Sequence, residues 1–251
     1  MRLKDKVAVV TGSSQGIGEA VALAFAAEGA KVCINYHSCA TGAQQVAEWI
    51  RAMGQEAIVV QADVSQAEQV QSMIQTTRNA FGPIDILVNN AGAYPRCSWE
   101  DLTENTWDRI VDINLKSQFL CARAVSDEMC ERRSGKIINV SSQAFLVGVK
   151  GLAHYTAAKG GVIGLTRAMA RELGEFTVCV NCIIPGAILV PKELEVAPDR
   201  DKVHAMLMDR QAIKRRGYPE DMVGAFVFFA SPESDFVTGQ CLNIDGGWAL
   251  Y

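Results

Sequence analysis

The sequence predicts an α/β protein built on one doubly wound, seven-stranded parallel sheet with helices on both faces. Two observations lead to this fold class. Short apolar runs rich in β-branched residues alternate with longer amphipathic segments, which is typical of a parallel sheet connected by helices. No linker rich in Pro, Gly or Ser divides the 251 residues, so residues 1–251 are expected to form a single domain.

Each element follows from its composition and its apolar spacing. The predicted strands are Val7–Val10, Lys31–Asn35, Ala57–Gln61, Ile84–Val88, Lys136–Val140, Val178–Ile184 and Cys241–Ile244. The predicted helices are Gly18–Ala27, Thr41–Ala52, Gln66–Phe81, Glu104–Glu131, His154–Leu173, a stretch within Pro198–Ile213, and Glu220–Ala230. Right-handed crossovers between parallel strands then place these helices on both faces of the sheet.

Composition and charge argue against several classes of function. The formal net charge is −4 and the isoelectric point is about 5.5, whereas a surface that binds nucleic acid is usually basic. The sequence opens directly into strand-like residues without a signal-peptide pattern. No apolar run approaches the ~18 residues needed to cross a membrane. We therefore expect a cytoplasmic protein that binds neither nucleic acid nor a membrane.

Cys179 and Cys182 form a C-x-x-C pair, a spacing found in some redox and zinc sites. The surrounding run has the composition of a strand, in which residues three apart face opposite sides. No second pair of Cys or His follows at a ligand spacing. We predict that both thiols are structural and that the protein has no metal site.

Three glycines, Gly12, Gly16 and Gly18, lie between the first predicted strand and the next helix. Glycine permits a tight turn and a close approach of the backbone to a phosphate. The N-terminus of the helix offers unpaired N–H groups and the positive end of its dipole. The spacing differs from the commonest dinucleotide fingerprint, and a plain turn is the alternative. The strand–turn–helix context favours a dinucleotide site.

The end of the second strand is expected to meet the adenosine ribose of a dinucleotide. An acidic residue there would bind the 2′-hydroxyl of NAD and repel a 2′-phosphate. This sequence has instead Asn35, Tyr36, His37 and Ser38, which are neutral or able to carry positive charge. We therefore favour NADP(H) over NAD(H), although no Arg or Lys stands there to reinforce the preference.

The segment AHYTAAKGG at 153–161 places Tyr155 and Lys159 about one helical turn apart, so both should lie on one helix face. An ordinary solvated helix face is the alternative for this pair alone. The wider set of motifs resembles the classical short-chain dehydrogenase/reductase family. The set comprises Gly12/Gly16/Gly18, NNAG at 89–92, SS at 141–142, YTAAK at 155–159 and PG at 185–186. The resemblance extends from Leu3 to DGG at 245–247. It implies a Rossmann fold and an NAD(P)-dependent oxidoreductase that interconverts a carbonyl and a secondary alcohol.

The resemblance implies catalytic roles for Asn114, Ser142, Tyr155 and Lys159. Tyr155 would be the general acid of carbonyl reduction and the general base of alcohol oxidation. Because a free phenol has a pKa near ~10, the ammonium of Lys159 is expected to favour the phenolate, and it would also bind the nicotinamide ribose. Ser142 would bind the substrate oxygen, with the Ser141 hydroxyl on the opposite face. Asn114 would hold a proton-relay water through Lys159; a buried amide that only satisfies backbone groups is the alternative.

The resemblance also implies cofactor contacts. At the glycine turn and the ribose end they are Gly12, Ser14, Gln15, Gly16, Ile17, Gly18, Asn35, Tyr36, His37 and Ser38. The others are Asp63 and Val64 at the adenine, Asn90, Ala91 and Gly92 beside the adenine ribose, Tyr155 and Lys159, and Pro185, Gly186 and Ile188 at the nicotinamide. Two positions depart from the family pattern: Val190 replaces a frequent Thr after PG, and Gln15 stands where many NADP-dependent members have Arg.

The substrate pocket is expected between these residues and a long connection at about 187–217, because long loops in compact domains are usually lids or binding loops. The candidate substrate contacts are Tyr94, Gln143, Phe145, His154 and Leu189. Their composition predicts an apolar pocket with a few polar contacts.

Three functions remain open. A ketone reductase or an alcohol or sugar dehydrogenase acting on a small free substrate is favoured, because HY at 154–155 and PGAI at 185–188 resemble those subfamilies. A 3-oxoacyl-[acyl carrier protein] reductase is the alternative, and its acidic partner would meet a basic patch. That patch would comprise Arg132, Arg133, Arg167 and Arg171. A non-catalytic dinucleotide-binding sensor is the third, and the complete tetrad argues against it. The family further implies a homotetramer.

Overall fold

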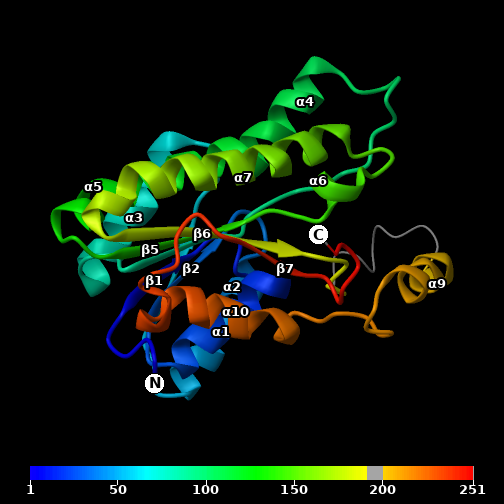
Figure 1. The fold of residues 1–251 in the computed structure, drawn as a ribbon. Coiled ribbons are helices and arrows are strands. Elements are labelled where there is room, and N and C mark those ends of the chain that lie inside the picture. The colour runs from blue at the N-terminus through cyan, green and yellow to red at the C-terminus, as the bar shows by residue number, and fades with distance from the viewer. Residues whose placement is uncertain (191–199, 251) are drawn as a thin grey trace.

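The structure is a computed structural model, and it describes residues 1–190 and 200–250. Within these residues, seven parallel strands form one sheet in the order β3-β2-β1-β4-β5-β6-β7 (Figure 1). The strands are β1 Val7–Val10, β2 Lys31–Tyr36, β3 Ala57–Gln61, β4 Ile86–Asn89, β5 Gly135–Val140, β6 Val178–Pro185 and β7 Cys241–Ile244. The order reverses between β1 and β4, which opens a crevice at the carboxyl ends of the strands, where ligands bind in such sheets. The predicted fold class is confirmed.

Helices cover both faces of the sheet. The helices α1 Gly16–Ala27, α2 Ala40–Ala52 and α10 Glu220–Ala230 pack on one face, and α3 Ala67–Phe81, α5 Ser117–Glu131 and α7 Ala153–Leu173 pack on the other (Figure 1). The remaining helical segments are α4 Glu104–Val111, η1 Asp112–Lys116, α6 Ala144–Val147, η2 Gly174–Phe176, α9 Arg200–Arg210 and η3 Pro232–Ser234. None of the described helices is long and apolar enough to cross a membrane.

The central strands are apolar throughout because both of their faces are buried. In β1, Ala8 and Val10 join the core under α1 and α10, whereas Val7 and Val9 join the core under α3 and α5. All four side chains are at most 4% exposed. The sheet therefore forms a rigid base for the turns at its carboxyl edge.

The long helix predicted over Glu104–Glu131 is interrupted. A π-helical turn at Asp112–Lys116 separates α4 from α5. Two side chains compete for the backbone carbonyls here: Asn114 Nδ2 donates to the Ile110 carbonyl at 2.9 Å, and Ser117 Oγ donates to the Ile113 carbonyl at 2.6 Å. Single π-turns often occur at functional sites, and this one carries a predicted catalytic residue.

Two other predictions need adjustment. The fourth strand begins at Ile86 rather than Ile84. The four-residue helix α6 was not predicted, because a single turn is too short to show apolar periodicity.

The two thiols of the C-x-x-C pair lie on opposite sides of β6: Cys182 packs against Val162 of α7, and Cys179 donates to the Asp235 carbonyl at 3.6 Å. This agrees with the strand interpretation.

The two ends of the connection predicted at 187–217 pair with each other through a short β-bridge. Ile188 forms a bridge with Gly217, and the Leu189 N–H donates to the Gly217 carbonyl at 2.8 Å. The helix predicted within this region is α9, which lies beyond the end of the sheet where the chain leaves β7 (Figure 1). Residues 191–199 of the connection lie outside the described residues. The paired base fixes where the connection joins the crevice.

Candidate active site

The glycine turn follows β1 and delivers the N-terminus of α1 to the crevice. Gly16, the first residue of α1, has φ of +63°, a conformation that other residues rarely adopt. A Cβ on Gly18 would lie 2.4 Å from the Gly12 carbonyl oxygen and 2.5 Å from Asn90 Nδ2. The turn is therefore built from glycines and leaves free helical N–H groups at its mouth. This cradle fits the phosphates of a dinucleotide.

The NNAG segment fixes the turn from the neighbouring strand. The Thr11 hydroxyl accepts the N–H groups of Asn90 and Ala91, both at 3.0 Å. Asn90 Nδ2 donates to the carbonyls of Thr11 at 2.9 Å and Gly12 at 3.0 Å. The Asn90 side chain thus holds the turn in shape. The nearby Gly92 is exposed, and it lies beside the side chains of Asn114 and Lys159.

Asn35 has a structural task that the sequence did not indicate. Its Oδ1 accepts the Gly12 N–H at 3.0 Å, and its Nδ2 donates to the Ala62 carbonyl at 3.1 Å. The residue is 2% exposed. Its side chain is therefore used inside the protein, and the predicted ribose contacts that retain exposed surface are Tyr36, His37 and Ser38.

Asp63 and Val64 follow β3 at the predicted adenine end. Asp63 Oδ1 accepts the backbone N–H and the hydroxyl of Ser65 at 2.9 and 2.7 Å, and its Oδ2 lies 3.9 Å from His37 Nε2. Burial alone would raise the pKa of Asp63, but the Ser65 hydrogen bonds and His37 lower it below its usual value. Val64 is buried in the core. A carboxylate therefore stands beside the one imidazole of the ribose end.

The two serines after β5 have different partners. Ser141 is buried, and its hydroxyl donates to the Lys159 carbonyl at 2.7 Å, which ties β5 to α7. The Ser142 hydroxyl accepts the Ala144 N–H at 3.2 Å and lies close enough to the Tyr155 phenol to lower its pKa. Ser142 is half-buried. The predicted separation of the two hydroxyls is therefore present.

Tyr155 lies near the start of α7, directly across from Ser142. Burial raises the pKa of the Tyr155 phenol to about 12; the nearby Ser142 hydroxyl lowers it and Tyr94 raises it. The rings of Tyr94 and Tyr155 have centroids 5.8 Å apart with an angle of 55° between their planes. The expectation that Lys159 lowers this pKa is not met, because burial is the dominant influence on the phenol. The phenol is held protonated.

Lys159 lies one turn further along α7 and is 2% exposed. Its Nζ donates to the Val140 carbonyl at 2.8 Å and lies 5.6 Å from the centre of the Tyr155 ring. Burial lowers the pKa of Lys159 to about 8, and Cys182 partly opposes this shift. The Lys159 side chain therefore changes between its charged and neutral forms close to neutral pH.

Asn114 is fully buried in the π-helical turn. Its Nδ2 donates to the Ala93 carbonyl at 2.8 Å, and its Oδ1 accepts the Ala93 N–H at 3.3 Å. A Cβ on Gly92 would lie 2.8 Å from Asn114 Oδ1 and 3.6 Å from Lys159 Nζ. Asn114 and Lys159 thus flank the same stretch of backbone. The structure brings all four tetrad residues to one place.

The predicted substrate contacts divide into two groups. Tyr94, Phe145 and Leu189 retain exposed surface, and the Tyr94 ring centre lies 5.8 Å from that of Tyr155. Gln143 and His154 are 3% and 0% exposed, respectively. Gln143 Nε2 donates to Asp245 Oδ2 at 3.1 Å, and His154 Nδ1 accepts the Tyr155 N–H at 2.9 Å. Burial lowers the pKa of His154, which keeps the imidazole neutral.

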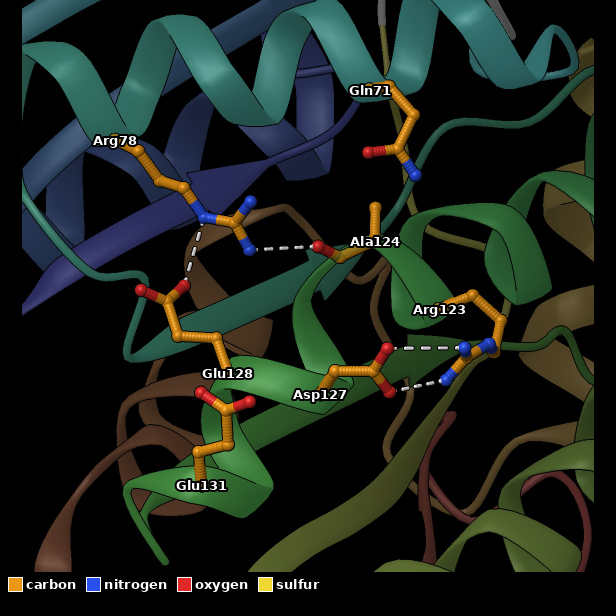
Figure 2. A pocket seen from close by; sticks show the side chains of 7 residues that line it. All are labelled: Gln71, Arg78, Arg123, Ala124, Asp127, Glu128 and Glu131. Atoms are coloured by element: carbon orange, nitrogen blue, oxygen red, sulfur yellow. Dashed lines mark hydrogen bonds and ion pairs between the residues drawn. The ribbon is translucent and has the colours of Figure 1, made fainter.

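A cavity of about 590 Å³ opens between α3 and α5, but it is not a candidate active site. Figure 2 shows charged side chains around it that are already paired: Arg78 with Glu128, and Arg123 with Asp127. None of the tetrad residues lines it. The active site is therefore assigned by its chemistry, at the carboxyl edge of the sheet.

The glycine turn and the Ser142–Tyr155–Lys159 cluster define an enzyme that binds a nicotinamide dinucleotide and acts on an alcohol or a carbonyl. The family model described as Enoyl-(Acyl carrier protein) reductase matches residues 12–249. A 3-oxoacyl-[acyl-carrier-protein] reductase of Synechocystis sp. is 41% identical over 99% of both chains. The (2S)-[(R)-hydroxy(phenyl)methyl]succinyl-CoA dehydrogenase subunit BbsD of Thauera aromatica is 40% identical over 100% of this chain and 99% of its own.

Solved structures agree. A candidate gluconate dehydrogenase from Agrobacterium tumefaciens superposes with a TM-score of 0.93 and 35% identity, covering 98% of this chain and 96% of that one. A double mutant of a short-chain dehydrogenase/reductase from Serratia marcescens has a TM-score of 0.92 and 34% identity over the whole of both chains. The chain belongs to the short-chain dehydrogenase/reductase family and is an oxidoreductase of CH–OH donors.

Proposed function

We propose that this protein reduces a ketone to a secondary alcohol with NADPH and catalyses the reverse reaction with NADP⁺. One observation carries the proposal: the phenol of Tyr155, whose pKa is raised by burial and lowered by the nearby Ser142 hydroxyl, lies beside the buried amine of Lys159. Ser142 would hold the substrate oxygen, and Tyr155 would donate its proton to that oxygen. The bound nicotinamide supplies the hydride.

The pKa values suit the reductive direction. With a pKa of about 12, Tyr155 carries its proton throughout the neutral range, as a general acid must. Lys159, with a pKa of about 8, carries charge below that pH and would stabilise the phenolate that remains after proton transfer. In oxidation, the same phenolate would accept the alcohol proton.

We propose that the glycine turn holds the pyrophosphate and that Tyr36, His37 and Ser38 meet the ribose. The absence of an acid at the end of β2 supports NADPH over NADH, since no carboxylate there competes with a 2′-phosphate. Asp63, 3.9 Å from His37, opposes that preference. We therefore expect a preference for NADPH smaller than one fixed by an arginine.

For the substrate, a 3-oxoacyl thioester is our first candidate. The names of two relatives near 40% identity support it, since one is a 3-oxoacyl-[acyl-carrier-protein] reductase and the other a dehydrogenase of a CoA thioester. Phe145, three residues after Ser142, and Leu189 are partly exposed and offer apolar surface for such a chain. An acyl carrier protein would be the partner if the thioester is tethered.

A free ketone or a sugar is the second candidate. It is favoured because two arginines of the basic patch, which was suggested to bind a carrier protein, already have partners within the chain. Arg132 donates to Asp85 Oδ1 at 3.1 Å, and Arg133 donates to the Glu175 carbonyl at 2.8 Å. These two guanidinium groups are already engaged, which weakens the case for an acidic protein partner.

We propose a homotetramer, as the family implies. Trp107 of α4 and Phe119 of α5 are 37% and 47% exposed. Large apolar side chains on neighbouring helices favour burial against a second copy. Sedimentation of the purified protein tests this directly.

The substrate is tested by following NADPH absorbance with acetoacetyl-CoA, the same acyl group on an acyl carrier protein, a free 3-oxoester and cyclic ketones. Alcohols and aldoses are assayed with NADP⁺. Turnover of the two thioesters above the free ketones supports the first candidate. Turnover confined to free ketones or aldoses supports the second. Parallel assays with NADH and NAD⁺ test the cofactor, and faster turnover with NADH would contradict the NADPH proposal.

A further inference from the structure

A buried carboxylate stands where the chain leaves β7. Asp245 is 6% exposed. Its Oδ2 accepts Gln143 Nε2 at 3.1 Å and the Ala249 N–H at 2.9 Å, while its Oδ1 accepts the Gly247 N–H at 2.9 Å. Both oxygens therefore act only as acceptors, which an ionised carboxylate does and an amide does not.

One of these partners belongs to the catalytic turn. Gln143 directly follows Ser142, and its own N–H donates to the Pro185 carbonyl at 3.0 Å. The Gln143 side chain is 3% exposed, so it makes its hydrogen bonds inside the protein rather than with water. The carboxylate of Asp245 thus fixes the residue next to the hydroxyl that is proposed to bind the substrate oxygen.

A second side chain binds the backbone of Asp245, and it belongs to the connection that carries α9. Gln211, the residue after α9, is 3% exposed, and its Nε2 donates to the backbone carbonyl of Asp245 at 2.9 Å. Its N–H donates to the Leu207 carbonyl at 2.9 Å, and the Ile213 N–H donates to the Gly246 carbonyl at 2.9 Å. The end of α9 is therefore fastened to the same residue as the catalytic turn.

The sheet holds this residue in place. The Gly186 N–H donates to the Ile244 carbonyl at 2.9 Å, and a Cβ on Gly186 would lie 2.6 Å from the Asp245 Cα. Close contact between the ends of β6 and β7 leaves Asp245 little freedom. Asp245 binds one segment through its carboxylate and the other through its backbone carbonyl, so a fixed residue here can set their relative position.

We propose that Asp245 is a positioning residue that couples the end of α9 to Ser142 through Gln211 and Gln143. This Gln143–Asp245–Gln211 link keeps the substrate-side connection docked while the Ser142 hydroxyl is held toward Tyr155. The inference rests on the proposed function, because it assigns a consequence for catalysis to the link. Geometry at the reacting atoms controls rate strongly, so small displacements of Ser142 have measurable effects.

Three variants separate the two arms of the link. Gln211→Met keeps the side-chain length and removes the donor to Asp245; it raises KM for the carbonyl substrate about threefold or more and changes kcat less than twofold. Gln143→Met releases the catalytic turn and lowers kcat by about tenfold. Asp245→Asn places an amide N–H group against the donors of its side chain but keeps the backbone carbonyl that Gln211 binds, so it lowers kcat as Gln143→Met does and changes KM less than twofold. Gln240→Met, which removes an exposed bond to the Thr238 carbonyl, is the matched control and leaves both constants unchanged.

Two further measurements distinguish positioning from a general structural role. The Kd of NADPH, followed by its fluorescence, stays within about twofold in all variants, since the link does not touch the glycine turn. Amide hydrogen exchange at 205–213 becomes faster in Gln211→Met than in the wild type and stays unchanged in Asp245→Asn, which keeps the carbonyl that Gln211 binds; this readout does not require turnover. If Asp245→Asn does not fold, Gln143→Met tests the same arm of the link.

The outcomes are separable. Faster exchange at 205–213 together with the split between KM and kcat supports the inference. Unchanged exchange and unchanged kinetic constants in folded Gln211→Met and Gln143→Met overturn it. A fall in kcat with a matching loss of NADPH-binding protein also overturns it, because that is a stability effect. If the wild type reduces no carbonyl, the proposed function fails, and with it the catalytic half of the inference, whereas the exchange data still decide whether the link exists.

Discussion

The Nζ of Lys159 lies 5.6 Å from the centre of the Tyr155 ring. Its hydrogen bond to the Val140 carbonyl, at 2.8 Å, anchors it to the end of β5. Lys159 is thus fixed to the edge of the sheet, where Ser142 also lies, and Tyr155 shares its helix face. A proton donor, a cation and a hydroxyl that can bind a substrate oxygen meet at one point. Five predictions follow from the chemistry of this arrangement and of the glycine turn beside it.

Reduction should lose rate above pH 8. The pKa of Tyr155 is raised to about 12, so the acid remains protonated, whereas the pKa of Lys159 is lowered to about 8. As pH rises through 8, Lys159 loses its charge and no longer stabilises the phenolate. We expect kcat for reduction to fall by up to about tenfold per pH unit above that point. A rate that stays level up to pH 10, with saturating NADPH, would contradict this role for Lys159.

Lys159→Met should stabilise the protein while removing activity. Burial of the ammonium opposes folding, and the Val140 carbonyl keeps its hydrogen bond from Gln118 Nε2 at 3.0 Å. We expect the free energy of unfolding at pH 7 to rise by on the order of 1 kcal/mol or more. Urea unfolding followed by circular dichroism measures the change.

The pH dependence of this stability gain provides its control. The pKa of Lys159 is about 8 in the folded protein, below its ordinary value of 10.5. Below pH 8 the lysine is charged in both states, so the wild type carries the full destabilisation. Between pH 8 and 10.5 the unfolded state binds more protons, and the wild type gains stability as pH rises. The advantage of Lys159→Met should therefore shrink across this window; an advantage that grows there would contradict the assignment.

Gly18→Ala should damage the glycine turn. The added Cβ would meet the Gly12 carbonyl oxygen at 2.4 Å, so the turn must shift. We expect a loss of about 1–3 kcal/mol in unfolding free energy and a clear increase in the Kd of NADPH.

Gly164→Ala is the matched control for that substitution. Gly164 lies on α7, and a Cβ there meets no atom within 4 Å. Alanine should stabilise this helix by about 0.5–1 kcal/mol and leave NADPH binding unchanged. Equal effects of the two substitutions would show that the turn is not the cofactor cradle.

Tyr36→Asp should reverse the cofactor preference. The new carboxylate would stand at the end of β2, where it can accept a hydrogen bond from a ribose 2′-hydroxyl and repel a 2′-phosphate. We expect the ratio of kcat/KM for NADPH over NADH to fall by about tenfold or more. Tyr36→Phe, which adds no charge, should change the ratio much less. A ratio that Tyr36→Asp leaves intact would place the 2′-phosphate elsewhere.

Most of the fold was predictable because buried parallel strands are continuous apolar runs. The strands Val7–Val10, Ala57–Gln61 and Cys241–Ile244 have the predicted bounds. The π-helical turn at Asp112–Lys116 was not predictable, because the apolar periodicity continues through it. Hydrogen bonds from the side chains of Asn114 and Ser117 to backbone carbonyls determine the backbone conformation there.

The candidate site shows the same division. Tyr155 and Lys159 share a helix face, so local spacing was sufficient to place them together. The Gln143 side chain points into the protein because it binds Asp245, 102 residues away. The Asn35 side chain does so because it binds the Ala62 carbonyl, 27 residues away. No local pattern contains such contacts. Sequence motifs therefore identified which residues gather, and tertiary contacts decided which side chains remain open to a ligand.

Tyr155→Phe provides the most direct measurement of the central claim. The substitution removes one hydroxyl and keeps the ring that packs on Tyr94. With the substrate found by the NADPH assay, the account predicts a loss of about 10²–10⁴ in kcat and an unchanged Kd for NADPH. Tyr218→Phe, at an exposed tyrosine, should retain wild-type rates. A Tyr155→Phe variant that reduces the carbonyl within a few-fold of the wild-type rate would contradict the assignment of Tyr155 as the general acid.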